Sequence, residues 1–91
     1  MPTVYLIHFD PPYRHARHYL GSCADLAPRL WAHQHGRGAR LTQVAVGAGC
    51  ALVLARTWEG GRQLERRLKR RHNAPQLCPI CAALAQGGGH D

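Results

Sequence analysis

A single glutamate in this sequence is surrounded by basic residues. Glu65 is one of only five acidic residues in the chain, and Arg62, Arg66 and Lys69 flank it. Positive charges nearby keep a carboxylate ionised, as a ligand for a hard divalent cation must be. One carboxylate, completed by waters and a substrate phosphate, suits Mg²⁺ or Mn²⁺. Glu65 also stands four residues before Lys69, which is the favourable order for a helical ion pair, so the pattern allows either role.

Arg29 is the second residue whose position suggests chemistry. Its planar guanidinium stays charged and can bind two oxygens of a phosphate at once. We expect a strand that contains Tyr19, then a turn, then a helix over residues 25 to 35. This arrangement brings Arg29 close to Tyr19. Asp25 and His33 share the helix face of Arg29 at spacings of four residues, so an exposed ion pair with Asp25 is the alternative role.

Two strands are expected to position the tyrosines. Residues Thr3 to Phe9 are rich in β-branched and aromatic types and predict a first strand, which Asp10-Pro11-Pro12 should end. Residues 16 to 21 predict a second strand, antiparallel to the first. A suitable register then brings Tyr5 and Tyr19 onto the same side of the sheet.

The junction between the second strand and the first helix contains its own signals. Gly21 permits a tight turn or a close approach of the backbone. Ser22 or Asp25 can cap the helix, and Gly36 should end it. The apolar residues expected to dock this helix are Leu26, Leu30 and Trp31.

The second half of the chain predicts a third strand and a basic helix. Residues 36 to 40 form a basic loop that either follows a phosphate backbone or is a solvated connector, and residues 41 to 46 form a short helix or an irregular segment. Cys50 to Trp58 is apolar enough to be covered on both faces, which predicts the central strand. Residues 62 to 72 predict a strongly basic helix. The expected fold is a small α/β domain with a three-stranded, mainly antiparallel sheet flanked by helices.

The charge of the chain predicts a polyanionic partner. Twelve lysines and arginines stand against five acidic residues, so the formal net charge is +7. Nucleic acid is the first choice and a membrane surface the second. No apolar run approaches the roughly 20 residues of a spanning helix, and the first residues lack the features of a signal peptide. We therefore expect one small cytoplasmic domain without a small-molecule cofactor.

The cysteines are too few and too unevenly spaced for a disulfide scaffold, so we expect them to be reduced or metal-bound. Cys78 and Cys81 have the spacing of a zinc half-site, and the candidates to complete it are His72, His90, Cys23 and Cys50. With one such pair, zinc ranks below Mg²⁺ or Mn²⁺ as the expected cofactor. A chelator should not unfold the domain, because apolar residues form its core.

A C-terminal extension carries this half-site. It is expected over residues 77–91, and its glycine-rich end, residues 87 to 91, is expected to be disordered. A redox role for the Cys-x-x-Cys pair is less favoured, because the thioredoxin-type βαβ context is missing.

The motifs, in their order, resemble those of the GIY-YIG nuclease superfamily. Tyr19-Leu20-Gly21, followed ten residues after the tyrosine by Arg29, is similar to the second motif and helical arginine of that family. Thr3-Val4-Tyr5 stands where the family has Gly-Ile-Tyr, and Leu64 to Lys69 looks like the helix that bears the metal-binding glutamate. The resemblance extends from residue 3 to residue 72 and implies a nuclease domain over residues 1–76.

The resemblance implies a metal-dependent DNA endonuclease of the small, stand-alone bacterial type. It assigns Tyr5, Tyr19, Arg29 and Glu65 as catalytic residues that converge on one phosphodiester. One tyrosine assists removal of a proton from water, and Tyr5 is our first choice; the arginine steadies charge on the phosphate, and Glu65 holds Mg²⁺ or Mn²⁺ near the leaving oxygen. The residues expected to bind the DNA are His33, Arg37, Arg40, Arg62, Arg66 and Lys69.

These assignments have alternatives. Both tyrosines fit half-buried strand positions with their hydroxyls at the rim, and His33 fits a surface histidine. Ser22 replaces a lysine that excision-repair relatives carry after their Tyr-x-Gly element, and Thr3 replaces the first glycine. The alternative functions are a catalytically silent nucleic-acid-binding module and a zinc-dependent interaction protein.

Overall fold

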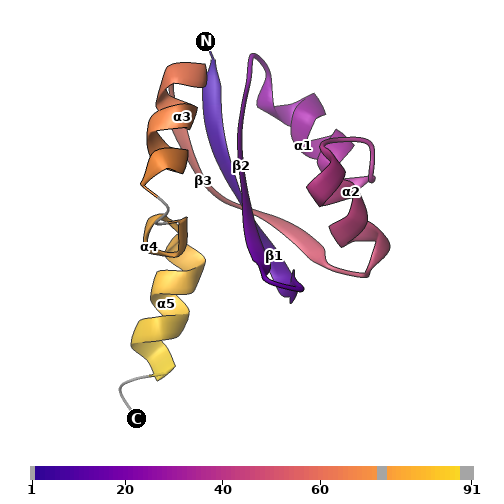
Figure 1. The fold of residues 1–91 in the computed structure, drawn as a ribbon, viewed down its shortest axis with the longest axis vertical. Coiled ribbons are helices and arrows are strands. Elements are labelled where there is room, and N and C mark those ends of the chain that lie inside the picture. The colour runs from indigo at the N-terminus through magenta and orange to yellow at the C-terminus, as the bar shows by residue number, and fades with distance from the viewer. Residues whose placement is uncertain (1, 72–73, 89–91) are drawn as a thin grey trace.

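The computed structural model describes residues 2–71 and 74–88. Its strands and helices, in chain order, are β1 (Thr3–Tyr13), β2 (Ala16–Cys23), α1 (Leu26–Gln34), α2 (Arg40–Gly47), β3 (Ala51–Glu59), α3 (Arg62–Arg70), α4 (Ala74–Leu77) and α5 (Pro79–Gly88). The strands form one antiparallel sheet in the order β2-β1-β3. Helices α1 and α2 lie on one side of this sheet and α3, α4 and α5 on the other (Figure 1). The expected α/β fold with a three-stranded antiparallel sheet is confirmed.

β1, and not β3, is the central strand. Each residue from Val4 to Phe9 exposes less than a tenth of its surface. The prediction that the apolar run from Cys50 to Trp58 forms the central strand is wrong, since β3 pairs with β1 at the edge of the described sheet and leaves Val53 39% exposed. Apolar character measures how much of a strand is covered, and it does not show how many strands pair with it.

The ends of the β1–β2 hairpin also differ from the prediction. β1 continues through Pro11 and Pro12 to Tyr13 instead of ending at the prolines. The two prolines lie where the register between β1 and β2 shifts, and prolines are tolerated there because they interrupt no regular ladder. β2 runs to Cys23, so Gly21 lies inside a strand and not in a turn.

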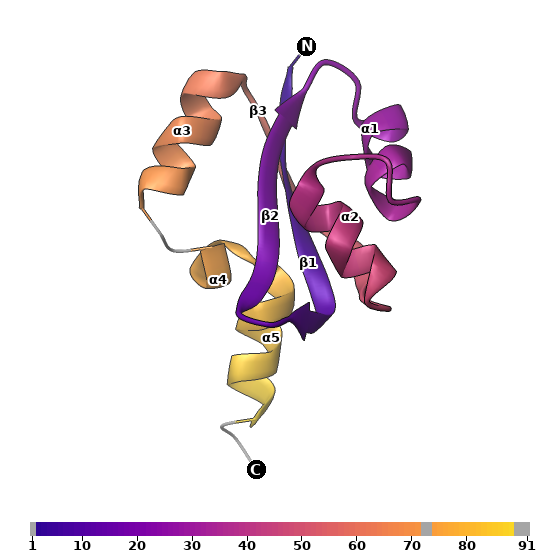
Figure 2. The ribbon, with the colours of Figure 1, turned by 45° about the vertical axis from the view of Figure 1, so that its right-hand side comes forward.

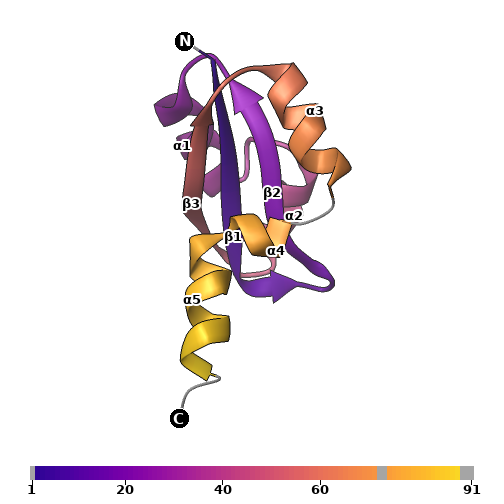
Figure 3. The same ribbon diagram turned by 90° about the vertical axis from the view of Figure 1, so that its left-hand side faces the viewer.

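Alternate residues of β1 face the two sides of the sheet. The odd-numbered residues from Tyr5 to Phe9 belong to the core formed with α1 and α2, and we call this side the odd face. The even-numbered residues from Val4 to His8 point the other way, toward the side that α3, α4 and α5 cover (Figure 3). We call this side the even face; Leu68 of α3, 7% exposed, packs there.

Local signals account for the helix ends. Asp25 occupies the N-cap position of α1 without a side-chain cap bond, and Gly36 has a φ of 71°, so the chain leaves the helix there as expected. Trp31 is 49% exposed and stacks on His35, so it does not dock α1 as predicted. The segment predicted as a short helix or irregular structure is the helix α2, which already includes Arg40.

The C-terminal half keeps the predicted basic helix. In α3, Glu65 lies in the first turn and Arg67, Lys69 and Arg70 in the last, an arrangement that complements the helix dipole. The predicted end at residue 72 lies outside the described residues. α5 includes Gly87 and Gly88, the first residues of the tail expected to be disordered, and residues 89–91 lie outside the described residues. None of the helices described is long and apolar enough to cross a membrane.

Candidate functional site

Strand β2 is an edge strand of the described sheet and runs between α3 on one side and α1 and α2 on the other (Figure 2). A concave surface follows its free edge. One pocket, of about 340 Å³, is lined by Tyr19, Gly21, Ser22, Arg62, Glu65 and Arg66. A second, of about 460 Å³, is lined by Pro2, Ser22, Cys23, Ala24, Arg29, Gly61 and Arg62. The two share Ser22 and Arg62 and therefore form one continuous surface, which we call the β2-edge pocket.

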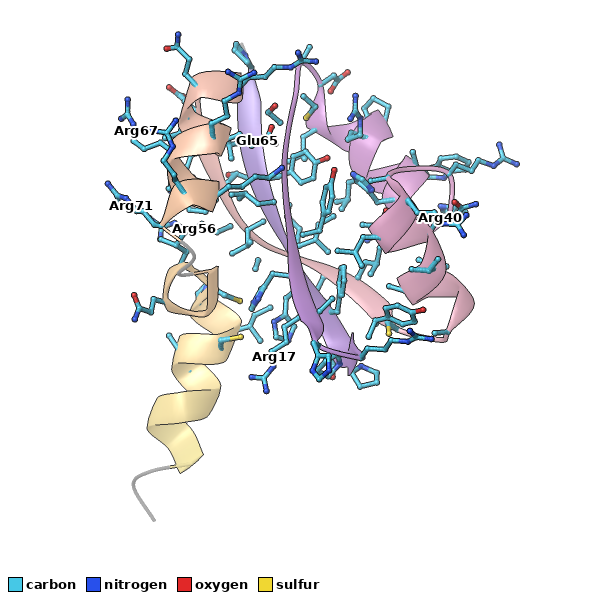
Figure 4. The ribbon with its side chains drawn as sticks, viewed as in Figure 1. Arg17, Arg40, Arg56, Glu65, Arg67 and Arg71 are labelled. Atoms are coloured by element: carbon cyan, nitrogen blue, oxygen red, sulfur yellow. The ribbon has the colours of Figure 1, made fainter. Side chains whose placement is uncertain are left out.

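Both oxygens of the Glu65 carboxylate have a partner in this pocket. Ser22 donates a hydrogen bond from its Oγ to Oε1 at 2.5 Å, and the Nζ of Lys69 lies 2.7 Å from Oε2. The ion pair that the helical spacing predicts is therefore present. The Glu65 side chain is 18% exposed and lies on the side of α3 that faces the sheet, while Arg67 and Arg71 point away from it (Figure 4).

The surroundings of Glu65 keep it ionised. Burial raises the pKa of this carboxyl. The hydrogen bonds from Lys69 and Ser22 and the charges of Lys69 and Arg62 lower the pKa by more than burial raises it, so the pKa is below its ordinary value. The Ser22 hydroxyl thus orients the glutamate. A half-buried, ionised carboxylate at the rim of a pocket is suited to bind a cation.

Gly21 allows the two tyrosines to pack together. Tyr5 pairs with Gly21 and Ile7 with Tyr19 across the hairpin, so both tyrosines lie on the odd face as expected. Their ring centroids are 6.2 Å apart. A Cβ at Gly21 would lie 2.7 Å from the Tyr5 hydroxyl and 2.9 Å from the Tyr19 ring. The glycine of the Tyr-x-Gly element therefore serves the close approach of Tyr5 rather than a turn.

Gly21→Ala should lower the free energy of unfolding by about 1–3 kcal/mol, because the added methyl group overpacks a buried, hydrogen-bonded tyrosine. Urea unfolding monitored by circular dichroism measures this loss. Gly47→Ala is the matched control, since a Cβ there meets nothing within 4 Å and the residue lies in a helix. The control should be neutral or more stable by up to about 1 kcal/mol. Equal stability of the two variants would show that Tyr5 has room to move.

A buried hydrogen-bond chain holds Tyr5 from behind. Thr42 donates its only hydroxyl hydrogen to the carbonyl of Ala39 at 2.9 Å, so its oxygen accepts from Nδ1 of His33 at 2.7 Å. His33 then has a free lone pair on Nε2, which accepts the Tyr5 hydroxyl at 2.7 Å. Burial, followed by the charge of Arg29, lowers the pKa of His33, which keeps the ring neutral as this chain requires.

His33 and Tyr5 are less accessible than predicted. His33 is 1% exposed and bonded at both ring nitrogens, so it is neither a surface histidine nor a phosphate ligand in this structure. Tyr5 is fully buried, and burial, with a further contribution from Tyr19, raises its pKa to about 12 despite the opposing effect of Arg29. Tyr19 is the tyrosine that lines the β2-edge pocket.

The structure brings together most, but not all, of the predicted site. Arg29 borders the pocket from α1, and no ion pair joins it to Asp25 among the described residues. Arg37 lies over the Trp31 ring, 5.7 Å from its centroid. Arg40 lies at the start of α2, across the sheet from Glu65 (Figure 4). Arg37 and Arg40 are thus not among the residues that line the pocket, whereas Arg62 and Arg66 line it.

A second cluster lies on the even face. His8, His18, Cys78 and Cys81 place their ligand atoms within 4.8 Å of one another, so this His₂Cys₂ cluster could bind a metal ion, and its ligand types favour zinc. The predicted half-site is therefore completed by His8 and His18. Cys23 and Cys50, which were proposed to complete it, lie instead in the core of the odd face, and His72 and His90 lie outside the described residues.

Four functional candidates were missed from the sequence. Thr42 accepts a hydrogen bond from His33, and Gly38 packs directly against the His33 ring, so both support the hydrogen bond between His33 and Tyr5. Neither was proposed from the sequence, which predicted a loop at Gly38 and a short helix or irregular segment at Thr42. His8 faces His18 across the hairpin. A hairpin register that pairs Tyr5 with Gly21 also places His8 opposite His18, so this register would have revealed the histidine pair. No local signal in the sequence indicates that Cys78 approaches the two histidines.

Comparison with known proteins gave no match among family models, curated proteins or solved structures.

Proposed function

We propose that this protein is a metal-dependent DNA endonuclease that hydrolyses phosphodiester bonds, as its resemblance to the GIY-YIG nucleases implies. One observation carries the proposal: Tyr19 of β2, Arg29 of α1 and Glu65 of α3 all border the β2-edge pocket. These residues come from three elements, of which α3 is distant in sequence from the consecutive elements β2 and α1. Their convergence on one concave surface is what a catalytic role requires and what three independent surface residues would not show.

The arginines of the pocket suit a scissile phosphate. Arg29, Arg62 and Arg66 line the surface around Glu65 and supply more positive charge than one carboxylate balances. A phosphodiester bound there would find guanidinium groups that can donate two hydrogen bonds at once. Arg29 is the group we assign to the charge that develops on the phosphate oxygens as water attacks.

The donors at Glu65 fit Mg²⁺ or Mn²⁺, which prefer oxygen ligands and retain waters. Glu65 would hold the ion with its carboxylate, with the Ser22 hydroxyl beside it, and Lys69 would move into solvent from its place at Oε2. The Lys69 side chain is already 52% exposed, so this movement meets little resistance. Such an ion, when bound, would stabilise negative charge on the leaving oxygen.

The two tyrosines divide the work in this proposal. Tyr19 contacts the substrate and its attacking water, because it lines the pocket, and it replaces Tyr5 as our first choice for that contact. Tyr5 acts from behind Gly21. Because its hydroxyl hydrogen points to Nε2 of His33, Tyr5 can accept a proton only as it passes its own to the histidine, and Thr42 holds the histidine in the tautomer that allows this.

The basic outer face of α3 suits the DNA backbone on either side of the cleaved bond. Affinity for DNA should therefore fall steeply with salt and show little sequence preference. In a plot of the logarithm of the association constant against the logarithm of the salt concentration, each neutralised phosphate contributes about −0.9 to the slope. Arg67→Gln should reduce this slope by about one unit, since Arg67 points into solvent from α3. Fluorescence anisotropy of a labelled duplex at several salt concentrations measures both slopes.

A flat salt dependence between low and moderate salt would contradict binding to a polyanion. A slope unchanged by Arg67→Gln would instead place the DNA away from α3.

Cleavage itself should be tested on a panel of labelled linear, supercoiled, flapped and branched DNAs. Mg²⁺ or Mn²⁺ should support cleavage, and Ca²⁺ should support binding without it. The metal should be withheld rather than removed with a strong chelator, because a chelator would also strip a metal from the His₂Cys₂ cluster. Tight DNA binding with no cleavage on any substrate would favour the silent binding module, a reading consistent with the Glu65–Lys69 ion pair.

A further inference from the structure

The His₂Cys₂ cluster on the even face has no part in the proposed nuclease site. His8 and His18 pair across the β1–β2 hairpin, on alternate positions to the tyrosines, so they point away from the odd face. Cys78 lies between α4 and α5, and Cys81 lies in the first turn of α5. Four ligating side chains from the two ends of the chain therefore meet at one point.

Four of the six separations between the ligand atoms match those of a tetrahedral site, and all six are within 4.8 Å. Nδ1 of His8 lies 3.4 Å from Nε2 of His18, 3.6 Å from the Sγ of Cys78 and 3.5 Å from the Sγ of Cys81. The Sγ of Cys81 lies 3.3 Å from Nε2 of His18. Zinc bonded to two nitrogens and two sulfurs at its usual distances separates these atoms by about 3.3–3.8 Å.

Hydrogen bonds alone do not account for this arrangement. Nδ1 of His8 faces three groups at once, yet one imidazole nitrogen offers either a single hydrogen or a single lone pair. At most one of these contacts can be a good hydrogen bond at any time. A cation at the centre would satisfy all four groups together, and two thiolates would balance the charge of a divalent ion, so that a neutral unit is buried.

We propose that His8, His18, Cys78 and Cys81 bind one zinc ion that fastens the C-terminal segment, α4 and α5, to the β1–β2 hairpin. The chain fills all four positions, which is typical of a structural site rather than a catalytic one. Cys78 is fully buried and His8 is 8% exposed, while His18 and Cys81 are partly buried.

Two other contacts support the docking of this segment. Arg56 of β3 donates a hydrogen bond to the carbonyl of Leu77 at 3.4 Å, immediately before Cys78. The backbone N–H of Ala82 donates to the carbonyl of Cys78 at 3.0 Å, which closes the turn that contains both thiols. A metal bound by the four ligands would add to these contacts and so strengthen the attachment of the segment.

Metal analysis of the untagged protein, purified with zinc in the buffer and then desalted, tests the proposal. About one zinc per chain is expected. Co²⁺ in place of zinc should give the visible bands and thiolate charge-transfer absorption of a tetrahedral site. Zinc removal should increase hydrogen exchange in residues 77–88 and leave the exchange of α2 unchanged, because α2 packs on the odd face and holds no ligand.

Cys81→Ser and His18→Gln each remove one ligand and should weaken zinc binding by more than about 100-fold. His15→Gln is the control, since His15 is exposed in the same hairpin and should retain full zinc. The proposal is overturned if the folded parental protein binds neither zinc nor Co²⁺ stoichiometrically, or if it purifies with iron instead. Equal binding by Cys81→Ser and the parental protein would also exclude this site. None of these results depends on whether the protein cleaves DNA.

Discussion

Glu65→Gln should abolish DNA cleavage while leaving the fold intact. Loss of a metal-binding carboxylate removes several kcal/mol of transition-state stabilisation, which corresponds to a rate lowered by more than about 10³-fold. The glutamine keeps the size and helix propensity of the glutamate, and its Oε1 can still accept the hydrogen bond from Ser22. DNA binding should be equal or slightly tighter, because one repulsive charge is gone. Cleavage rate, DNA affinity and melting temperature should be measured on the same preparation.

The structural role of Glu65 makes a different prediction. If the carboxylate serves only its ion pair with the largely exposed Lys69, the variant loses at most about 0.5 kcal/mol of stability and no activity. Glu59→Gln is the charge-matched control, because Glu59 is exposed at the end of β3 and outside the pocket. A Glu65→Gln protein that cuts DNA at the parental rate would remove this glutamate, and most of the proposed mechanism, from consideration.

Arg29→Ala should slow the chemical step by about 10²–10³-fold even at saturating DNA, because its proposed work is on charge at the reacting phosphate. The fold should be kept, since Arg29 is exposed and α1 packs on the core through Leu26 and Leu30. Single-turnover cleavage at saturating protein separates this loss from weaker binding.

Arg29→Lys is the matched variant for this experiment. Lysine keeps the charge and loses the planar, bidentate geometry, so it should recover the DNA affinity and only part of the rate. If Arg29→Ala weakens binding while the rate at saturation is unchanged, Arg29 is an ordinary phosphate-binding residue. A fully active Arg29→Ala protein would contradict both roles.

The candidate site lies at a sheet edge and takes residues from both faces of the sheet. Glu65 and Ser22 belong to the even face, whereas Tyr5 and His33 belong to the odd face. The two groups can share a substrate only around the free edge of β2, where Gly21 and Ser22 line the pocket. The proposed zinc ion lies on the even face as well, next to the segment that follows α3, so it would limit the freedom of the chain beyond the Glu65 helix without contacting the pocket.

Local sequence signals were sufficient for the features that depend on neighbours in the chain. The β-branched and aromatic residues of Thr3 to Phe9 predicted a strand, Gly36 predicted a helix end, and the basic stretch that carries Glu65 predicted a helix. Each prediction held because backbone propensity and side-chain spacing act over a few residues. Alternation along the two strands also predicted that a suitable register would bring Tyr5 and Tyr19 onto the same side of the sheet.

Only the tertiary structure decided the features that depend on long-range packing. It shows β1 at the centre of the sheet, Tyr5 and His33 buried behind Gly21, and Cys78 opposite a pair of histidines some 60 to 70 residues earlier. A register shift in β3 between the partners of Leu6 and Ile7 turns Arg56 toward the C-terminal segment, and no local pattern marks it. Such contacts form where whole faces of elements meet, and their free energy comes from burial and convergence that no short stretch of sequence contains.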